Sequence, residues 1–561
     1  MSRTPPEIDD IGPVLRSAPA PRPVGATRTW AFVLLLGLYV LPGLVGHEPW
    51  KQDETYIADI VRTMLATGDA VVPRMAGEAF MEKPPLYYWV AGALAALTSP
   101  VLPLHDGARL ATGVFMLLAC AALAQCGRRW VDADFGRTAV CVLLGCFGLA
   151  AYSHLMLTDT ALLAGIALGM AGLPHWRTRP VASGLQIGAG VGIGFLAKGL
   201  IAPGVFGLAA VLLPLCFARW RARAYARTVL AALLAALPWL TVWPAALWLR
   251  DPGLFHDWIW TNNIGRFTGF AVPELGAAHD PGFWAENLWW ITFPALPLAA
   301  LALWRGRALL RTDERMQSAI VLAAVIFGVL VASRSARGGY ALPLLLPLSL
   351  LGARSAVTLA PRVESAWRLC ARVLFGGIAV ALWLAWAAIV FAPASMALPD
   401  IVPPHPDRHL DMMKLACASV ATVAAARLRL CALHTWATGV ALGWLLVATL
   451  FLPWIDDVKS YRQVFIALQP ALGPGCAASW GVGESERAML HYYDGVVTER
   501  LETRPASACT LILLEDPEGR LPRCSDAASW RPVREGARPA DRHERFWLFR
   551  RAPGPAACTD R

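Results

Sequence analysis

The residues best suited to catalysis lie near the start of the chain. They are two adjacent carboxylates and, about thirty residues further on, an acidic residue beside a basic one. Asp53 and Glu54 follow the first apolar run, and Glu82-Lys83 precede two prolines and an aromatic run. A carboxylate can act as a general base, and a lysine ammonium can stabilise negative charge on a leaving group. The pattern predicts a carboxylate pair and a lysine that act together. The alternative is a solvated, charged loop.

The segment between these two pairs has the pattern of a helix that lies on a membrane surface. Ile57, Ile60, Val61, Met64 and Leu65 recur at spacings of three and four residues, which places them on one face of a helix. We therefore expect interfacial helices to hold the charged residues against the membrane face.

The composition is that of a membrane protein. Of the 561 residues, 56% are hydrophobic and 16% are charged, and the mean hydropathy is +0.48. The apolar residues come in blocks of membrane-spanning length, and basic clusters lie between the blocks, as the positive-inside rule requires. The net charge of +10 therefore does not indicate nucleic-acid binding, and no nucleic-acid partner is expected.

The alternation of basic clusters and apolar blocks predicts about thirteen membrane-spanning helices, including one over 138–157 and one after 250–283. The N-terminus would lie in the cytoplasm and the C-terminal tail outside. The run Leu86–Leu97 is too short to span, and Arg128-Arg129 fall on the cytoplasmic side only if this run is interfacial. The first apolar run has no small-residue cleavage site, so we expect a retained anchor.

The predicted fold is a polytopic α-helical membrane protein with interfacial helices and a small extracytoplasmic α/β domain. The expected regions are a cytoplasmic tail over 1–28, a catalytic membrane domain over 29–454 with outer loops at 47–107 and 250–283, and a soluble domain over 455–561.

The soluble tail is predicted from its own patterns. Strand-like runs at 509–515 and 545–550 and a helix-like run at 484–493 indicate a small α/β domain. Outside the cytoplasm, four cysteines in the tail could form two disulfides in any of three connectivities. These cysteines are Cys476, Cys509, Cys524 and Cys558.

Short motifs occur in a specific order between residue 29 and about residue 350. They are Asp53-Glu54-Thr55, Gly68-Asp69, Glu82-Lys83-Pro84, Arg109, Thr158-Asp159, Ala197-Lys198-Gly199 and Asn263-Ile264-Gly265-Arg266-Phe267. Each is weak alone, but together they resemble the C-superfold glycosyltransferases, membrane enzymes that take a sugar from a polyprenyl phosphate. Within this superfold the sequence is most similar to the lipid A aminoarabinose transferase family, with the protein O-mannosyltransferases as more distant relatives.

The resemblance implies roles for the polar residues. Asp53 would be the base that acts on the acceptor, and Asp159 a second carboxylate that positions the acceptor, the sugar amine or a cation, with Glu54 as a third catalytic candidate. The donor phosphate would be bound by Lys83, Arg266, Arg337 and Tyr340. Further candidates for the substrate cavity are Glu82, Tyr56, Tyr87, Tyr88, Arg109 and Asn263.

Simpler roles are open for three of the motif residues. Asp159 could cap the helix that follows it. Arg266 and Lys198 could anchor lipid headgroups.

The sequence departs from the family at two places. Relatives can carry a histidine where this chain has Asn263, and often a lysine before the tyrosine where this chain has Gly338-Gly339, so Arg337 would supply that cation. A divalent metal ion is a possible cofactor, with Glu82 as its ligand.

The resemblance implies transfer of a sugar, 4-amino-4-deoxy-L-arabinose, from undecaprenyl phosphate to lipid A. The enzyme would be a monomer in the cytoplasmic (inner) membrane, with its active site and tail on the periplasmic side. A protein or another glycan is the alternative acceptor. A lipid-linked sugar transporter is a third possibility, but transporters usually carry acidic residues deep in a span, and the sequence shows none there.

Overall fold

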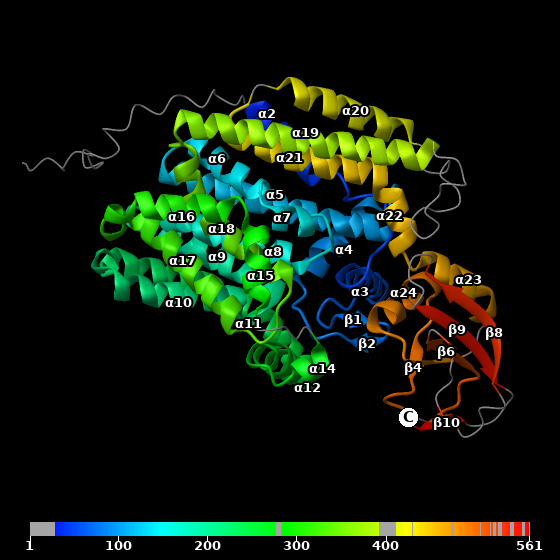
Figure 1. Cartoon of the computed structure of the whole chain (residues 1–561). Coiled ribbons are helices and arrows are strands. Elements are labelled where there is room, and N and C mark those ends of the chain that lie inside the picture. The colour runs from blue at the N-terminus through cyan, green and yellow to red at the C-terminus, as the bar shows by residue number, and fades with distance from the viewer. Residues whose placement is uncertain are drawn as a thin grey trace, which may run out of the picture.

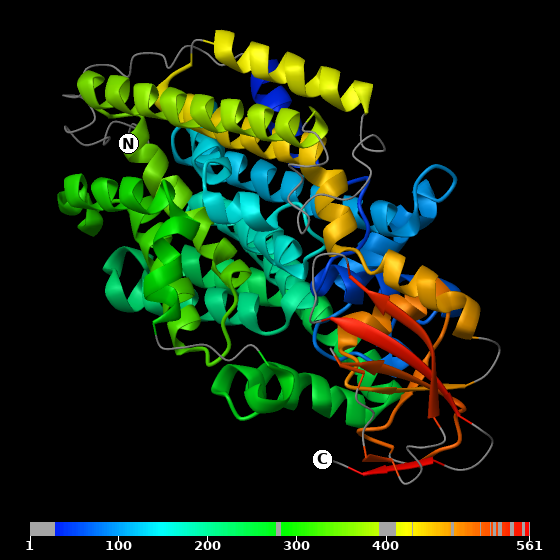
Figure 2. The same cartoon turned by 45° about the vertical axis from the view of Figure 1, so that its right-hand side comes forward.

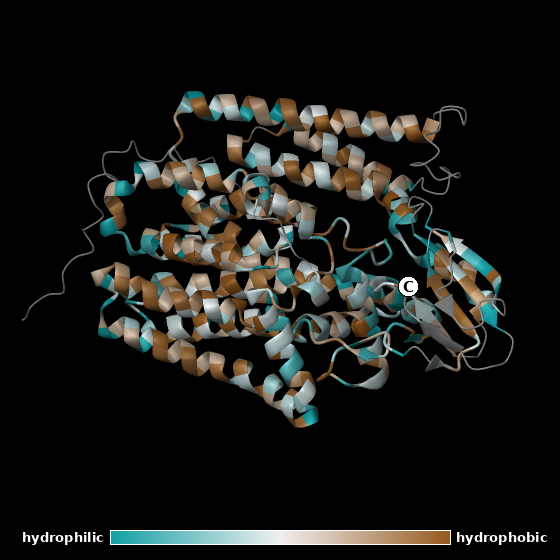
Figure 3. Ribbon diagram, turned by 60° about the horizontal axis from the view of Figure 1, so that its bottom comes forward, coloured by the Kyte–Doolittle hydropathy of each residue, from teal (hydrophilic) through white to brown (hydrophobic). Residues whose placement is uncertain are grey.

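The computed structural model describes residues 29–276, 282–391, 411–428, 430–472, 476–504, 506–516, 518–519, 523–524, 530–538, 544–551 and 556–559. These residues form a helical body with a smaller sheet domain at one end (Figures 1 and 2). Apolar residues predominate along the helices of the body (Figure 3), as expected where helices contact lipid or one another.

The helices of the body come in the following order along the chain. Up to residue 250 they are α2 (Thr29–Val40), α3 (Asp53–Thr67), α4 (Leu86–Thr98), α5 (Leu104–Trp130), α6 (Ala133–Leu144), α7 (Phe147–Tyr152), α8 (Thr158–Gly172), α9 (Pro180–Lys198), α10 (Ile201–Cys216) and α11 (Arg223–Arg250). After residue 250 they are α12 (Pro252–His256), α13 (Arg266–Thr268), α14 (Val272–Leu275), α15 (Phe283–Thr292), α16 (Ala295–Arg305), α17 (Glu314–Ala332), α18 (Leu342–Ala356), α19 (Pro361–Phe391), α20 (Met412–Arg427), α21 (Ala432–Leu446) and α22 (Leu452–Lys459).

The body has the helices of a multi-pass membrane protein. Among the described residues, α5, α9, α11, α17, α19 and the run Ala432–Leu472 are long and apolar enough to cross a membrane, and the bent pair of α15 and α16 would add one more. The helix α4 has only 13 residues, fewer than the roughly 20 that a span needs, which fits an interfacial position. The total of about thirteen spans stays a prediction.

Two of the predicted continuous spans are broken, and the two breaks meet. The helix predicted over 138–157 ends at Leu144 and resumes as the short α7, and α15 and α16 enclose an angle of 86°. The Trp436 indole donates to the carbonyl of Gly145 (3.0 Å), and the Phe147 N–H donates to the carbonyl of Phe293 (3.3 Å). Each of these two segments is therefore a broken helix, because tertiary partners take up backbone groups at the breaks, and the two membrane spans stay predictions.

The tail forms the predicted α/β domain. The domain contains a sheet with the strand order β4-β3-β6-β9-β8. The helix α23 (Arg462–Leu472) packs against β8 and β9, and α24 (Glu484–Asp494) follows β3 in the chain. Its strands are β3 (Ala477–Trp480), β4 (Thr498–Arg500), β6 (Leu511–Glu515), β8 (Trp530–Ala537) and β9 (Arg545–Arg551). The central strand β6 pairs in parallel with β3 and antiparallel with β9, and its residues Leu511 to Leu514 are buried, as expected of a strand inside a sheet.

Two smaller sheets complete the described strands. The strands β1 (Arg74–Met75) and β2 (Glu78–Ala79) form a hairpin between α3 and α4. The other small sheet has the order β5-β10-β7 and consists of β5 (Ala506–Ser507), β10 (Ala556–Thr559) and β7 (Arg523–Cys524).

One of the two predicted disulfides is present in the described residues. It joins Cys476, just before β3, to Cys509, just before β6, with the Cα atoms 5.0 Å apart. If two bridges form, this pairing leaves one of the three connectivities. The second bridge stays a prediction and would join Cys524 to Cys558, whose backbones lie opposite each other in β7 and β10.

Three carboxylates gather at the edge of the sheet domain that faces the helical body. Oxygens of Glu486, Glu515 and Glu544 lie within 4.8 Å of one another. Burial, and then the nearby charge of Glu486, raise the pKa of Glu515 to about 7. Glu515 therefore carries a proton over part of the neutral range, which limits the repulsion within the cluster.

We predict that Glu515 makes the stability of the sheet domain depend on pH. Because its pKa is raised from 4.5 to about 7 in the folded chain, its contribution is fully present below about pH 4.5 and is lost as the pH rises through about 7. Glu515→Gln cannot ionise, so it should melt at a higher temperature than the unsubstituted chain at pH 8, with a difference that shrinks towards pH 5. Thermal melts of detergent-solubilised protein measure this difference.

The exposed Glu535 on β8 provides the control for this experiment. Glu535→Gln should shift the melting temperature by a similar small amount at both pH values. An equal shift for Glu515→Gln at the two pH values would show that its pKa is not raised.

Candidate active site

Several helix ends from the first two thirds of the chain meet around one cavity of about 60 Å³. Asp53 is the first residue of α3, Asp159 lies in the first turn of α8, and Lys198 is the last residue of α9. A negative side chain is stabilised at a helix N-terminus and a positive one at a C-terminus. The full lining is Asp53, Lys83, Tyr152, Leu157, Asp159, Lys198, Arg337, Gly339 and Tyr340.

The first carboxylate of the cavity is held by two cations. The Lys83 ammonium donates a hydrogen bond to Oδ1 of Asp53, and Nη1 of Arg337 lies 3.7 Å from its Oδ2. Lys83 is fixed on a short stretch ahead of Pro84 and Pro85, where the proline rings restrict the backbone. Asp53 and Lys83 are thus brought together as predicted.

The second carboxylate has a cation of its own. The Lys198 ammonium donates to Oδ1 of Asp159 and also lies 3.9 Å from the centre of the Tyr340 ring, a cation–π contact. The N-cap position of α8 is Leu157, so Asp159 lies inside the first turn of the helix and not at the cap. The simpler role of Asp159 as a helix cap therefore finds no support.

The charges of the cavity keep both members of the Asp53–Lys83 pair ionised. Burial opposes ionisation of Asp53, but Lys83, Arg337 and Lys198 outweigh it and lower the pKa of the carboxyl. Burial likewise disfavours the ammonium of Lys83, but Asp53 and Glu82 raise its pKa well above the usual value. Three cations and two carboxylates line the cavity, so it carries a positive excess that suits an anion.

Glu82 and Arg266 lie behind Lys83. Nη1 of Arg266 donates to Oε1 of Glu82 (2.6 Å), and the same oxygen lies 3.8 Å from Nζ of Lys83. Two cations therefore already face the Glu82 carboxylate. Of the described residues, the groups of His, Cys, Asp and Glu that could hold a metal ion are Cys476 with Glu499 and Cys509, and Glu486 with Glu515 and Glu544. Neither includes Glu82, so its role as a metal ligand stays a prediction and no chemical step is assigned to a metal.

Glu54 does not face the cavity, although it adjoins Asp53. Its carboxylate accepts from Nε of Arg109 (2.9 Å) and from the backbone N–H groups of Trp50 (3.1 Å) and Met156 (3.0 Å). Arg109 is fully buried and also donates to Oδ1 of Asp106 (2.7 Å). This ion pair ties the starts of α3 and α5 to the stretch ahead of α8, so Glu54 and Arg109 support the cavity from behind.

Asn263 contacts the residues that follow Lys198 and does not line the cavity itself. Its Oδ1 accepts from the N–H of Leu200 (3.3 Å), and its Nδ2 donates to the carbonyl of Trp258 (2.8 Å). Gly199 has φ of 67°, and a Cβ there would meet Oδ1 of Asn263 at 2.0 Å. Asn263 therefore fixes the turn that follows Lys198, where only glycine fits.

Three tyrosines predicted for the cavity lie beside it. Tyr87 is buried and its hydroxyl pairs with that of Thr112 (2.6 Å). Tyr88 is buried, and Tyr56 packs its ring against Phe80. The structure thus gathers Asp53, Asp159, Lys83, Arg337 and Tyr340 around the cavity. It leaves Glu54, Arg266, Glu82, Tyr56, Tyr87, Tyr88, Arg109 and Asn263 outside the lining, and the chemical roles of all of them stay predictions.

The sequence motifs do not assign four residues of the lining to the cavity, namely Tyr152, Leu157, Lys198 and Gly339. Lys198 lay in a recognised motif but was also compatible with a lipid anchor, and only its contact with Asp159 separates the two roles. Tyr152 carried no sequence signal. A Cβ on Gly338 would lie 2.2 Å from the Tyr152 hydroxyl, so the Gly338-Gly339 pair makes room for this side chain.

Known proteins resemble the chain along most of its length, although no protein-family model matches it. The undecaprenyl phosphate-alpha-4-amino-4-deoxy-L-arabinose arabinosyl transferase of Pseudomonas paraeruginosa is 31% identical over 447 residues, which is 75% of this chain and 75% of that protein. The protein of the same name from Pseudomonas aeruginosa UCBPP-PA14 is 33% identical over 348 residues, and that match spans 59% of its length.

A solved structure has the same fold. ArnT from Cupriavidus metallidurans bound to undecaprenyl phosphate matches 93% of this chain and 98% of its own, with a TM-score of 0.69 and 20% identity. Its apo form matches with a TM-score of 0.63.

The relatives and the shared fold define the chain as a membrane glycosyltransferase of the C-superfold, with a cavity of paired charges at the converging helix ends. The chain belongs to the family of undecaprenyl phosphate-4-amino-4-deoxy-L-arabinose arabinosyl transferases. The family predicted from the ordered motifs is therefore confirmed.

We predict that Arg109 matters for stability. Arg109→Met would leave the buried carboxylate of Glu54 without its cation, and breaking a buried pair in this way typically costs about 3–5 kcal/mol. The free energy of unfolding in detergent should fall by that amount. The double variant with Glu54→Gln should recover part of the loss, because it buries one fewer unpaired charge.

Arg250→Met is the matched control, since Arg250 pairs with Asp69 at 3.4 Å with a largely exposed side chain. Such a pair is worth about 1 kcal/mol or less. An equal loss of stability in the two single variants would contradict the structural role of Arg109.

Proposed function

We propose that the chain transfers 4-amino-4-deoxy-L-arabinose from undecaprenyl phosphate to lipid A. The observation that supports this most directly is the cavity in which Asp53–Lys83 and Asp159–Lys198 form ion pairs beside Arg337 and Tyr340. It combines carboxylates with an excess of cations, as the transfer of a sugar from a phosphate requires. Membership of the arabinosyl transferase family supports the choice of sugar and carrier.

The reaction breaks one bond and forms another at the anomeric carbon of the sugar. An oxygen of the acceptor attacks this carbon, and the electron pair of the carbon–oxygen bond leaves with the lipid phosphate. Lys83, Lys198 and Arg337 would bind the phosphate and stabilise the charge that it gains. Asp53 would accept the proton of the acceptor or orient it, since its lowered pKa keeps the carboxylate ionised.

The side of the membrane is part of the proposal. The basic clusters alternate so that the cavity and the sheet domain fall on the periplasmic face of the cytoplasmic membrane. The Cys476–Cys509 disulfide supports this side, because disulfides persist mainly in oxidising compartments.

Mass spectrometry of lipid A from cells with and without the chain tests the sugar and the acceptor. The proposal expects lipid A species carrying the amino sugar only in cells that produce the chain. Unchanged lipid A with a newly glycosylated protein or glycan would instead support the alternative acceptor class.

We predict different effects for the two members of the first ion pair. Asp53→Asn keeps the shape but removes the charge, so transfer should fall by about 10²-fold or more, as for a lost general base, while donor binding survives. Lys83→Ala should weaken donor binding and slow turnover together, because the phosphate is charged both before and during departure. Purified variants with labelled polyprenyl-phosphate sugar measure both quantities.

Glu314→Gln, which removes an exposed ion pair with Arg177, is the control and should transfer normally. Near-normal transfer by Asp53→Asn would move the role of base to Asp159. Activity in both the Asp53→Asn and Asp159→Asn variants would refute the assignment of the cavity as the active site.

A further inference from the structure

The residues just ahead of Asp53 are held by the C-terminal part of the chain. Oδ1 of Asp456, on α22, accepts from the N–H of Glu48 (2.9 Å) and from the indole of Trp50 (2.8 Å). The Glu48 carboxylate accepts from Arg462 (2.9 Å) and from the hydroxyl of Tyr493 (2.9 Å). The segment that leads into α3 is therefore attached to elements more than four hundred residues away.

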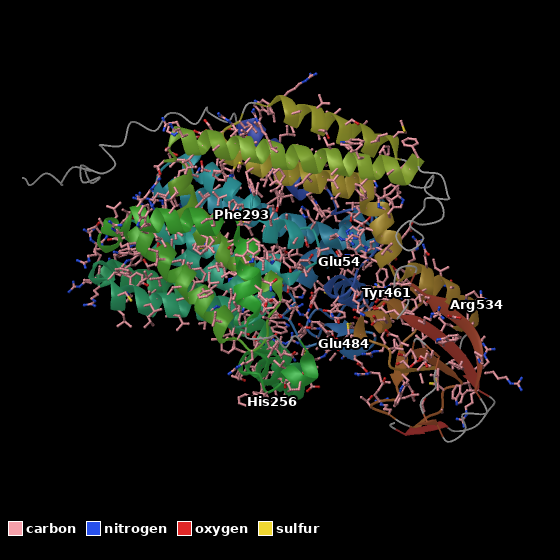
Figure 4. All side chains as sticks on the ribbon, viewed as in Figure 1. Glu54, His256, Phe293, Tyr461, Glu484 and Arg534 are labelled. Atoms are coloured by element: carbon pink, nitrogen blue, oxygen red, sulfur yellow. A yellow bond between two sulfur atoms is a disulfide. The ribbon has the colours of Figure 1, made fainter. Side chains whose placement is uncertain are left out.

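Lys51, two residues before Asp53, reaches into the carboxylate cluster of the sheet domain. Its ammonium lies 2.8 Å from Oε1 of Glu486 and 2.9 Å from Oε1 of Glu544. The Tyr461 hydroxyl lies within hydrogen-bonding distance of the same two carboxylates, at 2.7 and 2.9 Å. Figure 4 shows Tyr461 and Glu484 at the junction between the helical body and the sheet domain.

The cluster provides a defined position for this one cation. Glu486 is 1% exposed, and a buried carboxylate is stable only when an opposite charge or hydrogen-bond donors meet it. Lys51 supplies that charge, and hydrogen bonds between ionised groups are about twice as strong as neutral ones. The Lys51 side chain is 36% exposed, but its ammonium ends between carboxylates that are only 1% and 14% exposed, so the domain fixes its position.

The helix α24 also holds α3 further along. Nδ1 of His491 lies 2.6 Å from Oδ1 of the fully buried Asp59, and Nη1 of Arg62 lies 3.3 Å from Nε2 of the same histidine. Oδ2 of Asp59 accepts from the N–H of Ala76 (2.6 Å). One helix of the sheet domain thus carries both Glu486, which contacts Lys51, and His491, which contacts the middle of α3.

We propose that Lys51 is a positioning residue for transfer, and that the sheet domain sets the position of the Asp53 carboxylate through the Lys51–Glu486–Glu544 contact. This inference rests on the proposed function. The domain is then a working part of the active site, although none of its described residues lines the cavity. The physical reason is that a shift of about 1 Å in a catalytic group can lower a rate by about 10²-fold.

The first test compares Lys51→Met with Lys51→Arg in the full-length chain. Lys51→Met removes the charge, so kcat should fall by about tenfold or more while the KM for the polyprenyl-phosphate sugar stays within about threefold. Lys51→Arg keeps the charge and should restore most of kcat. A smaller amount of folded enzyme would also lower the apparent kcat at an unchanged donor KM, so kcat is expressed per folded molecule in each variant.

Glu78→Gln is the matched control. Glu78 lies on β2 and also pairs with the sheet domain, with Nη1 of Arg487 at 3.3 Å and Nη1 of Arg500 at 3.9 Å, but it does not hold the segment ahead of Asp53. Its kcat should stay within about twofold of the unsubstituted chain. An equal loss of kcat in Glu78→Gln and Lys51→Met would show that domain attachment in general matters, and would overturn the specific role of Lys51.

Amide hydrogen exchange gives a reading that does not depend on the reaction. Peptides covering residues 47–56 should exchange faster in Lys51→Met than in the unsubstituted chain and in Glu78→Gln, because the segment loses one of its attachments. Unchanged exchange together with kcat within twofold would overturn the proposal. Faster exchange in a chain that transfers no amino sugar to lipid A would instead refute only the proposed function.

If Lys51→Met does not fold, the same measurements are made on Glu544→Gln. This variant keeps the shape of the side chain and leaves Glu486 in contact with Lys51, so a smaller fall in kcat is expected, again with the donor KM unchanged. Normal kcat and normal exchange in folded Glu544→Gln would then overturn the proposal.

Discussion

Each carboxylate in the cavity is held by a cation from a different segment of the chain. Asp53 at the start of α3 pairs with Lys83, and Asp159 at the start of α8 pairs with Lys198 at the end of α9. Removing such charges from water is costly unless opposite charges meet them with good geometry. The positions of α3, α8 and α9 are therefore tied to one another, because a displaced helix end would leave a charge unpaired.

These pairs also prepare the cavity for an anionic ligand. The cations are in place before a lipid phosphate arrives, and with Arg337 they outnumber the carboxylates of the lining. Preorganised charges stabilise a departing phosphate without first having to reorient. The residues behind the lining keep this arrangement rigid: Glu82 and Arg266 lie behind Lys83, and Asn263 supports the turn after Lys198.

Opposite charges also hold the sheet domain against the membrane body. The polar contacts of this domain with residues 47–79 concentrate on the segment ahead of Asp53 and on α3. They lie beside apolar packing in which α3 and α24 share one hydrophobic core. Charged contacts fix register and orientation more than they add affinity. The apolar packing therefore joins the sheet domain to the body, and the charged contacts fix its orientation.

The sequence by itself determined the membrane class, the α/β tail, the family and the five cavity residues Asp53, Lys83, Asp159, Arg337 and Tyr340. Hydropathy, strand patterns and ordered motifs are local properties, so they can be read without coordinates. The sequence could not show that Glu54, although it adjoins Asp53, points away from the cavity and pairs with the buried Arg109. Nor could it show that Lys198 pairs with Asp159 and not with a lipid headgroup. It also could not place the breaks at Gly145 and Phe293, or bring Lys51 to Glu486 across more than four hundred residues. These features depend on which groups meet in space, because a buried charge or an open backbone group is satisfied by whatever partner the fold brings within reach.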